Sequence, residues 1–98
     1  MLYMVINRGT RQLKIGYTSN NWATRSRAYD SHNPNIILID VCDGDKSLEN
    51  DYHMFLKDIN WSNVTMPNGK ISKEWFEIPK GIKKNDIKNL GFKYFTNI

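Results

Sequence analysis

A β-favouring apolar run at residues 2–6, followed by a run at 13–17 in which apolar and other residues alternate, predicts a β-hairpin. The runs 2–6 and 13–17 each place an apolar side chain at every second position, and such side chains share one face of a strand. Residues 7–10, Asn-Arg-Gly-Thr, separate the two runs with turn-forming residues. The hairpin therefore has one core face, formed by residues 2, 4, 6, 13 and 15.

The opposite face of this hairpin carries the first candidate chemistry. In the predicted register Tyr3, Lys14 and Gly16 lie together on that face. A glycine inside a strand packs nothing and often marks the close approach of a ligand or another backbone. A phenol and an ammonium beside an open glycine make an anion site, and Tyr17 and Thr18 continue the same stretch. The alternative is a half-buried strand with a bulge or bend at its glycine.

A helix is expected over residues 21–29, after a cap at Ser19 or Asn20. Arg25 and Tyr29 recur at helical spacing with a tryptophan and so share one face. Two interpretations of Arg25 follow. Its stem can cover the aromatic rings, or its guanidinium can point across the hairpin and bind a phosphate.

The middle of the chain predicts a strand followed by a second helix. The run 36–39, Ile-Ile-Leu-Ile, is typical of a central strand buried on both faces. Residues 46–57 form the helix, with Asp45 or Ser47 near its cap. Glu49 and His53, four residues apart, lie on a neighbouring face of that helix. Such a pair can hold a divalent metal or relay a proton, or it can be a surface pair that stabilises the helix.

The last third of the chain is less regular. Residues 58–71 are polar and predict an exposed loop, in which Trp61 packs on the body or stacks on a base. Residues 74–78 predict a short strand that ends at Pro79, and residues 92–95 a final strand. A basic cluster lies between them, formed by Lys80, Lys83, Lys84 and Lys88. The whole pattern predicts an α+β fold, with a small central antiparallel sheet made of the hairpin and a third strand, flanked by helices.

Size and charge limit the function classes. The 98 residues make a single domain, 1–98, and the net charge of +4 with a pI near 9.3 favours a polyanionic partner. The single cysteine, Cys42, excludes an internal disulfide and a cysteine zinc cluster, which favours a reducing, cytoplasmic compartment. No apolar run approaches the roughly 18 residues of a membrane helix, so we expect no membrane association.

These pieces, in this order, resemble the GIY-YIG endonuclease superfamily, in its phage and bacterial branch, which has a KIG motif and is described as a DNA-binding domain related to a phage T5 protein. The matching features are a tyrosine-bearing first strand, the Lys-Ile-Gly-Tyr-Thr stretch at 14–18, an arginine on the next helix, a Leu-Glu…His helix at 48–53, and the Glu-Trp-Phe motif at 74–76. The resemblance covers about residues 2–78. Residues 79–98 form a C-terminal extension outside it.

The resemblance implies a metal-dependent nuclease site. Tyr3 matches the general base that activates water, and Arg25 matches the arginine that orients the nucleophile and supports the phosphate. Tyr29 matches a further active-site tyrosine, Glu49 the single carboxylate that holds one divalent metal, Mg²⁺ or Mn²⁺, and His53 a histidine near the site in some branches. This chemistry is coherent, because a metal and an arginine stabilise the charge that builds on the phosphate while a base activates water.

One departure from the superfamily pattern leaves three functions open. Lys14 stands where the second tyrosine of the superfamily lies; it can contact an anion but supplies no hydroxyl. The chain can be a DNA endonuclease whose site also uses Gly16, Tyr17 and Thr18 to bind DNA. It can be a nucleic-acid-binding module without turnover. It can also be a viral interaction protein for a host protein or a small phosphorylated ligand. Both a monomer and a homodimer are compatible with the sequence.

Overall fold

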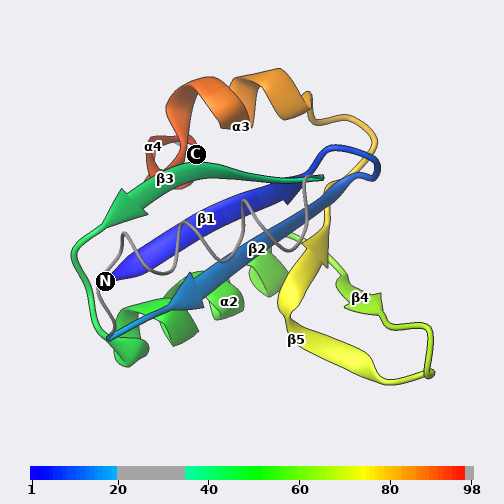
Figure 1. Ribbon diagram of the computed structural model, residues 1–98, viewed down its shortest axis with the longest axis horizontal. Helices are drawn as coiled ribbons and strands as arrows, with labels where there is room; N and C mark the ends of the chain where they lie inside the picture. Colours follow the sequence, from blue (N-terminus) through cyan, green and yellow to red (C-terminus); the bar gives the residue numbers. More distant parts are fainter. Residues whose placement is uncertain (20–34, 97–98) are drawn as a thin grey trace.

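The computed structural model describes residues 1–19 and 35–96, and these residues form the α+β fold that the sequence predicts. Their strands make one antiparallel sheet with the order β3-β1-β2-β5-β4 (Figure 1). The strands are β1 (Leu2–Asn7), β2 (Gln12–Tyr17), β3 (Ile36–Cys42), β4 (Asn63–Thr65) and β5 (Ile71–Glu77). The helices are α2 (Lys46–Asp58), α3 (Lys84–Leu90) and α4 (Phe92–Thr96).

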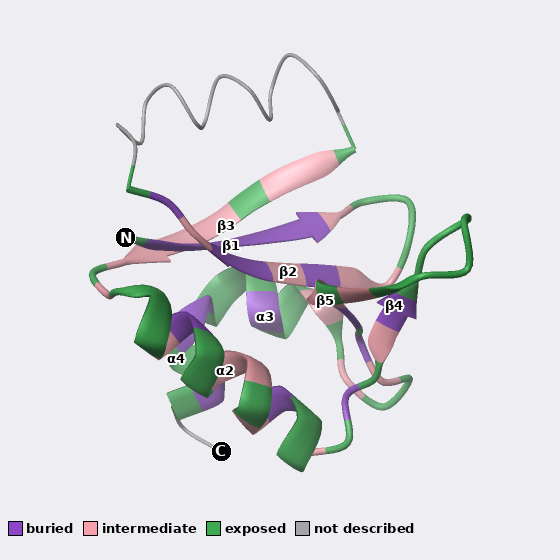
Figure 2. Ribbon diagram, turned by 90° about the horizontal axis from the view of Figure 1, so that it is seen from below, coloured by how far each residue is buried: buried purple, intermediate pink, exposed green. Residues whose placement is uncertain are grey.

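The hairpin forms in the predicted register, and its apolar face carries the core. Leu2 pairs with Tyr17 and Ile6 with Leu13, so the alternate positions of both strands point to one side. Figure 2 shows α2, α3 and α4 together on that side of the sheet. The fully or almost fully buried members of the core are Leu2, Met4, Ile6, Leu13, Ile15, Leu56, Trp61, Phe76, Ile78, Ile87, Phe92 and Phe95.

The prediction of a central strand buried on both faces was wrong. Among residues 1–19 and 35–96, β3 is an edge strand that pairs with β1 alone, and Leu38 at its middle is 36% exposed. A short apolar run looks the same at the edge of a sheet as at its centre. A register shift opposite Met4 and Val5 turns Asp40 toward the helices. There Asp40 accepts a hydrogen bond from the backbone N–H of Phe92 at 3.0 Å and anchors the start of α4.

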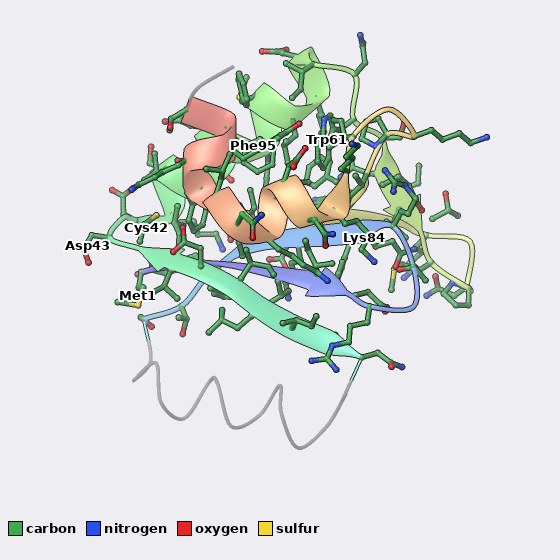
Figure 3. All side chains as sticks on the ribbon, turned by 90° about the horizontal axis from the view of Figure 1, so that it is seen from above. Met1, Cys42, Asp43, Trp61, Lys84 and Phe95 are labelled. Carbon is green, nitrogen blue, oxygen red and sulfur yellow. The ribbon has the colours of Figure 1, made fainter. Side chains whose placement is uncertain are left out.

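Two further predictions in the last third were also wrong. The expected loop 58–71 contains β4 and the start of β5, and Trp61 within it is 3% exposed. Trp61 packs edge-on against Phe95, with ring centroids 5.5 Å apart (Figure 3). The expected strand 92–95 is the helix α4, because Phe92 and Phe95 are three residues apart and both reach the core only on a helical backbone. Trp61 is thus a core residue, which confirms the interpretation that it packs on the body of the domain.

One lysine of the expected basic cluster has a structural role. The Nζ atom of Lys84 donates to the carbonyl oxygens of Asn7, Arg8 and Thr10 in the hairpin turn, at 3.1, 3.2 and 2.7 Å (Figure 3). Arg11 in turn donates to carbonyl oxygens of the segment after β5. The C-terminal segment is therefore clamped to the hairpin and belongs to the domain. None of the described helices is long and apolar enough to cross a membrane.

Candidate functional site

Tyr3 and Gly16 face each other across the hairpin, and the Tyr3 ring occupies the space where a side chain at position 16 would lie. They are direct partners in the β1–β2 register. A methyl group built at position 16 would lie on the Tyr3 hydroxyl and 2.5 Å from the ring carbon Cζ. Gly16 is therefore not an open space for a ligand, as the sequence suggested, because the Tyr3 ring fills it. The absence of a side chain at position 16 fixes where the phenol lies, and Tyr3 is only 1% exposed.

Lys14 connects this phenol to a carboxylate that sequence reasoning did not assign to the site. The Lys14 Nζ atom lies 5.6 Å from the centroid of the Tyr3 ring, in cation–π range. The same atom forms an ion pair with Glu74 Oε2 at 3.3 Å, in which the Lys14 side chain is 14% exposed and that of Glu74 45%. The pairing of β2 with β5, in which Lys14 lies opposite Trp75, brings Glu74 close. The Glu-Trp-Phe motif at 74–76, which contains Glu74, was the sequence feature that could have indicated its place in the site.

The sheet opens beside these residues, and His53 fills the opening. The β2–β5 ladder ends at the Lys14–Trp75 pair, so β2 beyond it has no strand partner on that side. There the Nε2 atom of His53 lies 2.7 Å from the carbonyl oxygen of Ile15. Since a carbonyl can only accept, Nε2 carries the hydrogen and the imidazole is held in one orientation. The ring also packs on Phe76 at 5.6 Å. This geometry assigns His53 a positioning role for β2.

Glu49 lies one helical turn before His53 on the same side of α2. The helix begins near the end of β2, because a methyl group built at Gly44 would lie near side-chain atoms of both Leu48 and Leu2, and Leu2 pairs with Tyr17. By this geometry Glu49 lies farther along the open edge of β2 than His53 does. Its side chain is only 4% exposed. Among the described residues, none forms a hydrogen bond or an ion pair with the Glu49 carboxyl group.

A buried carboxyl group without a partner is costly, and a bound cation would satisfy it. Within residues 1–19 and 35–96, no three histidine, cysteine, aspartate or glutamate side chains gather into a preformed metal centre. The arrangement fits a metal held by one protein carboxylate, with its other positions left for water and substrate oxygens. Glu49 is the one residue of the described site that fits this role.

Tyr17 and Thr18 complete the predicted stretch but lie in different surroundings. Tyr17 is half-buried and packs against the apolar core. Thr18 is buried, its N–H donates to the Met1 carbonyl at 3.0 Å, and its own carbonyl accepts from the Met1 amino group at 3.1 Å. Thr18 therefore holds the start of β1 beside the end of β2, which keeps Tyr3 in register with Gly16.

The structure thus brings the predicted site residues together in two sets. Tyr3, Lys14 and Gly16 lie on the sheet face opposite the helices, whereas Glu49 and His53 lie on α2, from which His53 contacts the Ile15 carbonyl of β2. Strand β2 thus connects the two sets. The other two predicted catalytic residues, Arg25 and Tyr29, lie outside the described residues.

Comparison with known proteins gives one match. The family model of the T5orf172 domain matches residues 1–90. This span includes both sets of site residues and continues past residue 78 through α3. No curated protein and no solved structure matches the chain.

Proposed function

Because the chain belongs to the T5orf172 domain family, we propose that it is a metal-dependent endonuclease that hydrolyses DNA phosphodiester bonds with a GIY-YIG-type site. The observation that carries this proposal is the buried Glu49 carboxyl group, which has no partner among the described residues. The Tyr3 phenol and the Lys14 ammonium lie together on the hairpin, and α2, which carries Glu49, contacts β2 of that hairpin through His53. These groups match the needs of phosphodiester hydrolysis, namely a base, a cation for the phosphate and a metal ligand.

In this proposal each described residue has one task. Glu49 holds the metal, and a bound Mg²⁺ or Mn²⁺ ion supplies Lewis-acid stabilisation of the phosphate. Lys14 contacts a phosphate oxygen, and its Nζ atom exchanges part of its Glu74 contact for the substrate. Tyr3, positioned by Gly16, acts as the general base in its phenolate form: it takes the proton of the attacking water as the water oxygen bonds to phosphorus and the bridging oxygen of the DNA backbone leaves. His53 keeps the β2 edge in place, while Arg25 and Tyr29 support the phosphate as the sequence resemblance implies.

Cleavage of supercoiled plasmid in Mg²⁺ or Mn²⁺ tests the proposal. We expect the parent protein to cut, and Glu49→Gln or added EDTA to abolish cutting. Asp51→Asn is the matched control, since Asp51 is an exposed carboxylate on the same helix, and it should cut like the parent. Cutting that survives Glu49→Gln would refute the metal assignment.

Thermal unfolding gives a second readout that does not depend on turnover. A metal that binds only the folded protein raises its stability, by about 2.7 kcal/mol at a hundredfold excess over Kd. Mg²⁺ or Mn²⁺ should therefore raise the melting temperature of the parent and of Asp51→Asn. Glu49→Gln should show no such rise. An equal rise in all three proteins would place the metal elsewhere.

A DNA-binding module without turnover is the second candidate. The observation that favours it is Lys14, which replaces a catalytic hydroxyl and is already paired with Glu74. A folded parent that binds DNA with a steep salt dependence, and cuts no plasmid in either metal, would support this candidate and overturn the nuclease.

A further inference from the structure

A groove lies on the Tyr3 face of the sheet, beside the proposed phosphate contact. It is lined by Asn7, Gln12, Ile36, Val64, Met66 and Trp75 and has a cavity volume of about 310 Å³. We refer to it as the Trp75 groove. Figure 1 shows β5 beside β2 with β4 beyond it, so the groove crosses the sheet from β3 to β4. None of the residues assigned above to catalysis or metal binding lines it.

The strand register connects the groove to the proposed site. Trp75 is the direct partner of Lys14, and directly opposed residues lie roughly 4.5–5.5 Å apart at Cα on the same face. Gln12 lies two residues before Lys14, nearer the hairpin turn, and pairs with Asn7, so both residues share this face. A nucleotide whose phosphate contacts Lys14 therefore has its base within reach of Trp75.

The lining favours a neutral aromatic ring. No described residue of the lining is charged, and its walls are an indole, a thioether and two branched aliphatic side chains. Asn7 uses its Oδ1 atom to accept from the Gly9 N–H at 2.9 Å, which leaves its amide nitrogen as a donor. Gln12 is bound only weakly, to Glu77 at 3.4 Å. Apolar walls with a few polar groups at the rim are typical of sites for small ring systems.

From these observations we propose that the Trp75 groove binds one unstacked nucleobase, so that the preferred substrate is DNA with a single-stranded or distorted segment. This inference rests on the proposed function, because it assumes that Lys14 contacts a DNA phosphate. The indole can stack only on a base whose face is free, and within a duplex that face is covered by neighbouring bases. Stacking on an aromatic side chain does not depend on base identity, so we expect little sequence preference.

The test compares two DNA strands of equal charge in EDTA, where nothing is cut. One is a fluorescent thymidine strand of about 15 nucleotides, and the other is an abasic strand of the same length. The parent should bind the thymidine strand about 5- to 150-fold more tightly. Trp75→Ala should reduce this preference to nearly none, and Trp75→Phe should keep most of it. Ile71→Ala is the matched control, because Ile71 is an exposed apolar residue of the same strand.

The outcomes separate this inference from the proposed function. Equal, salt-dependent binding of both strands by the parent would overturn the base site and leave the DNA function intact. Failure to bind either strand or a duplex would overturn both. A folded Trp75→Ala protein that keeps the preference would place base recognition outside the groove. Trp75→Phe keeps the test decisive if the alanine variant does not fold.

Discussion

The two faces of the sheet differ in what their side chains do. The face toward α2, α3 and α4 carries only apolar residues from the hairpin, and nearly all are fully buried. The opposite face carries a phenol over a glycine, a lysine shared between ring and carboxylate, and a half-buried indole beside a groove. The first face stabilises the fold, whereas the second holds polar groups in fixed positions. The candidate catalytic and binding groups of the hairpin are therefore the side chains that point away from the core.

Substitution of two adjacent residues of β5, Trp75 and Phe76, should give the largest difference in stability between the two faces. Phe76 is fully buried among the core residues, and Trp75 points to the other face and is half-buried. Phe76→Ala should lower the free energy of unfolding by about 3–5 kcal/mol. Trp75→Ala should lower it by less than half as much while removing base binding. Urea denaturation followed by far-ultraviolet circular dichroism measures both, and equal losses would contradict the division between the two faces.

The next effect comes from Gly16, where the second face is most tightly filled. Gly16→Ala puts a methyl group on the Tyr3 ring, and such overpacking costs about 1–3 kcal/mol. Because the ring must move, plasmid cleavage should fall more than stability does. Gly81→Ala is the control, since a methyl group there meets no atom within 4 Å and the backbone needs no positive φ. If Gly16→Ala cleaves like the parent, the position of Tyr3 does not matter for the reaction.

Much of the core face could be predicted because it follows from short-range sequence patterns. The hairpin register, the apolar set of β1 and β2, and the Asp45 cap of α2, whose side chain accepts from the Leu48 N–H at 3.0 Å, follow from local patterns. The edge position of β3 and the helical state of residues 92–95 could not be predicted, because they depend on which distant element packs beside a short apolar run.

The second face shows the same limit for the candidate site. The grouping of Tyr3, Lys14 and Gly16 follows from the hairpin alone and is confirmed. The Lys14–Glu74 ion pair depends on β5 pairing with β2 across about 60 residues of sequence. The burial of Glu49 likewise depends on how α2 lies along β2, and helical spacing alone also allowed an exposed pair with His53.

Substitutions of Lys14 and Glu74 should change the affinity for DNA by a smaller amount and in opposite directions. Lys14→Gln should weaken DNA binding and reduce the slope of log affinity against log salt by about 1, because one phosphate contact is lost. Glu74→Gln should strengthen binding, since it removes the carboxylate that competes for the Lys14 ammonium. A fluorescence titration at several salt concentrations measures both, with the exposed Lys88→Gln as control. A change of the same sign in the two variants would refute competition between Glu74 and DNA.

The smallest expected effect lies at the end of β3, where Cys42 pairs with Leu2 and packs against the core. Burial raises the pKa of the Cys42 thiol, and the negative charges of Asp40 and Asp43 raise it further. The folded state therefore favours the neutral thiol. This contribution to stability is complete below the pKa of about 8.5 of an unperturbed thiol. It is lost as the pH rises through the higher pKa of the thiol in the folded protein.

Alkylation by iodoacetamide requires the thiolate, so it should be slower in the folded protein than in urea at pH 8.5. Asp43→Asn should shift the pH–rate profile to lower pH, whereas Asp51→Asn, an exposed carboxylate on α2 that does not act on this thiol, should leave it in place. An unchanged profile in Asp43→Asn would show that the charge of Asp43 does not act on the Cys42 thiol.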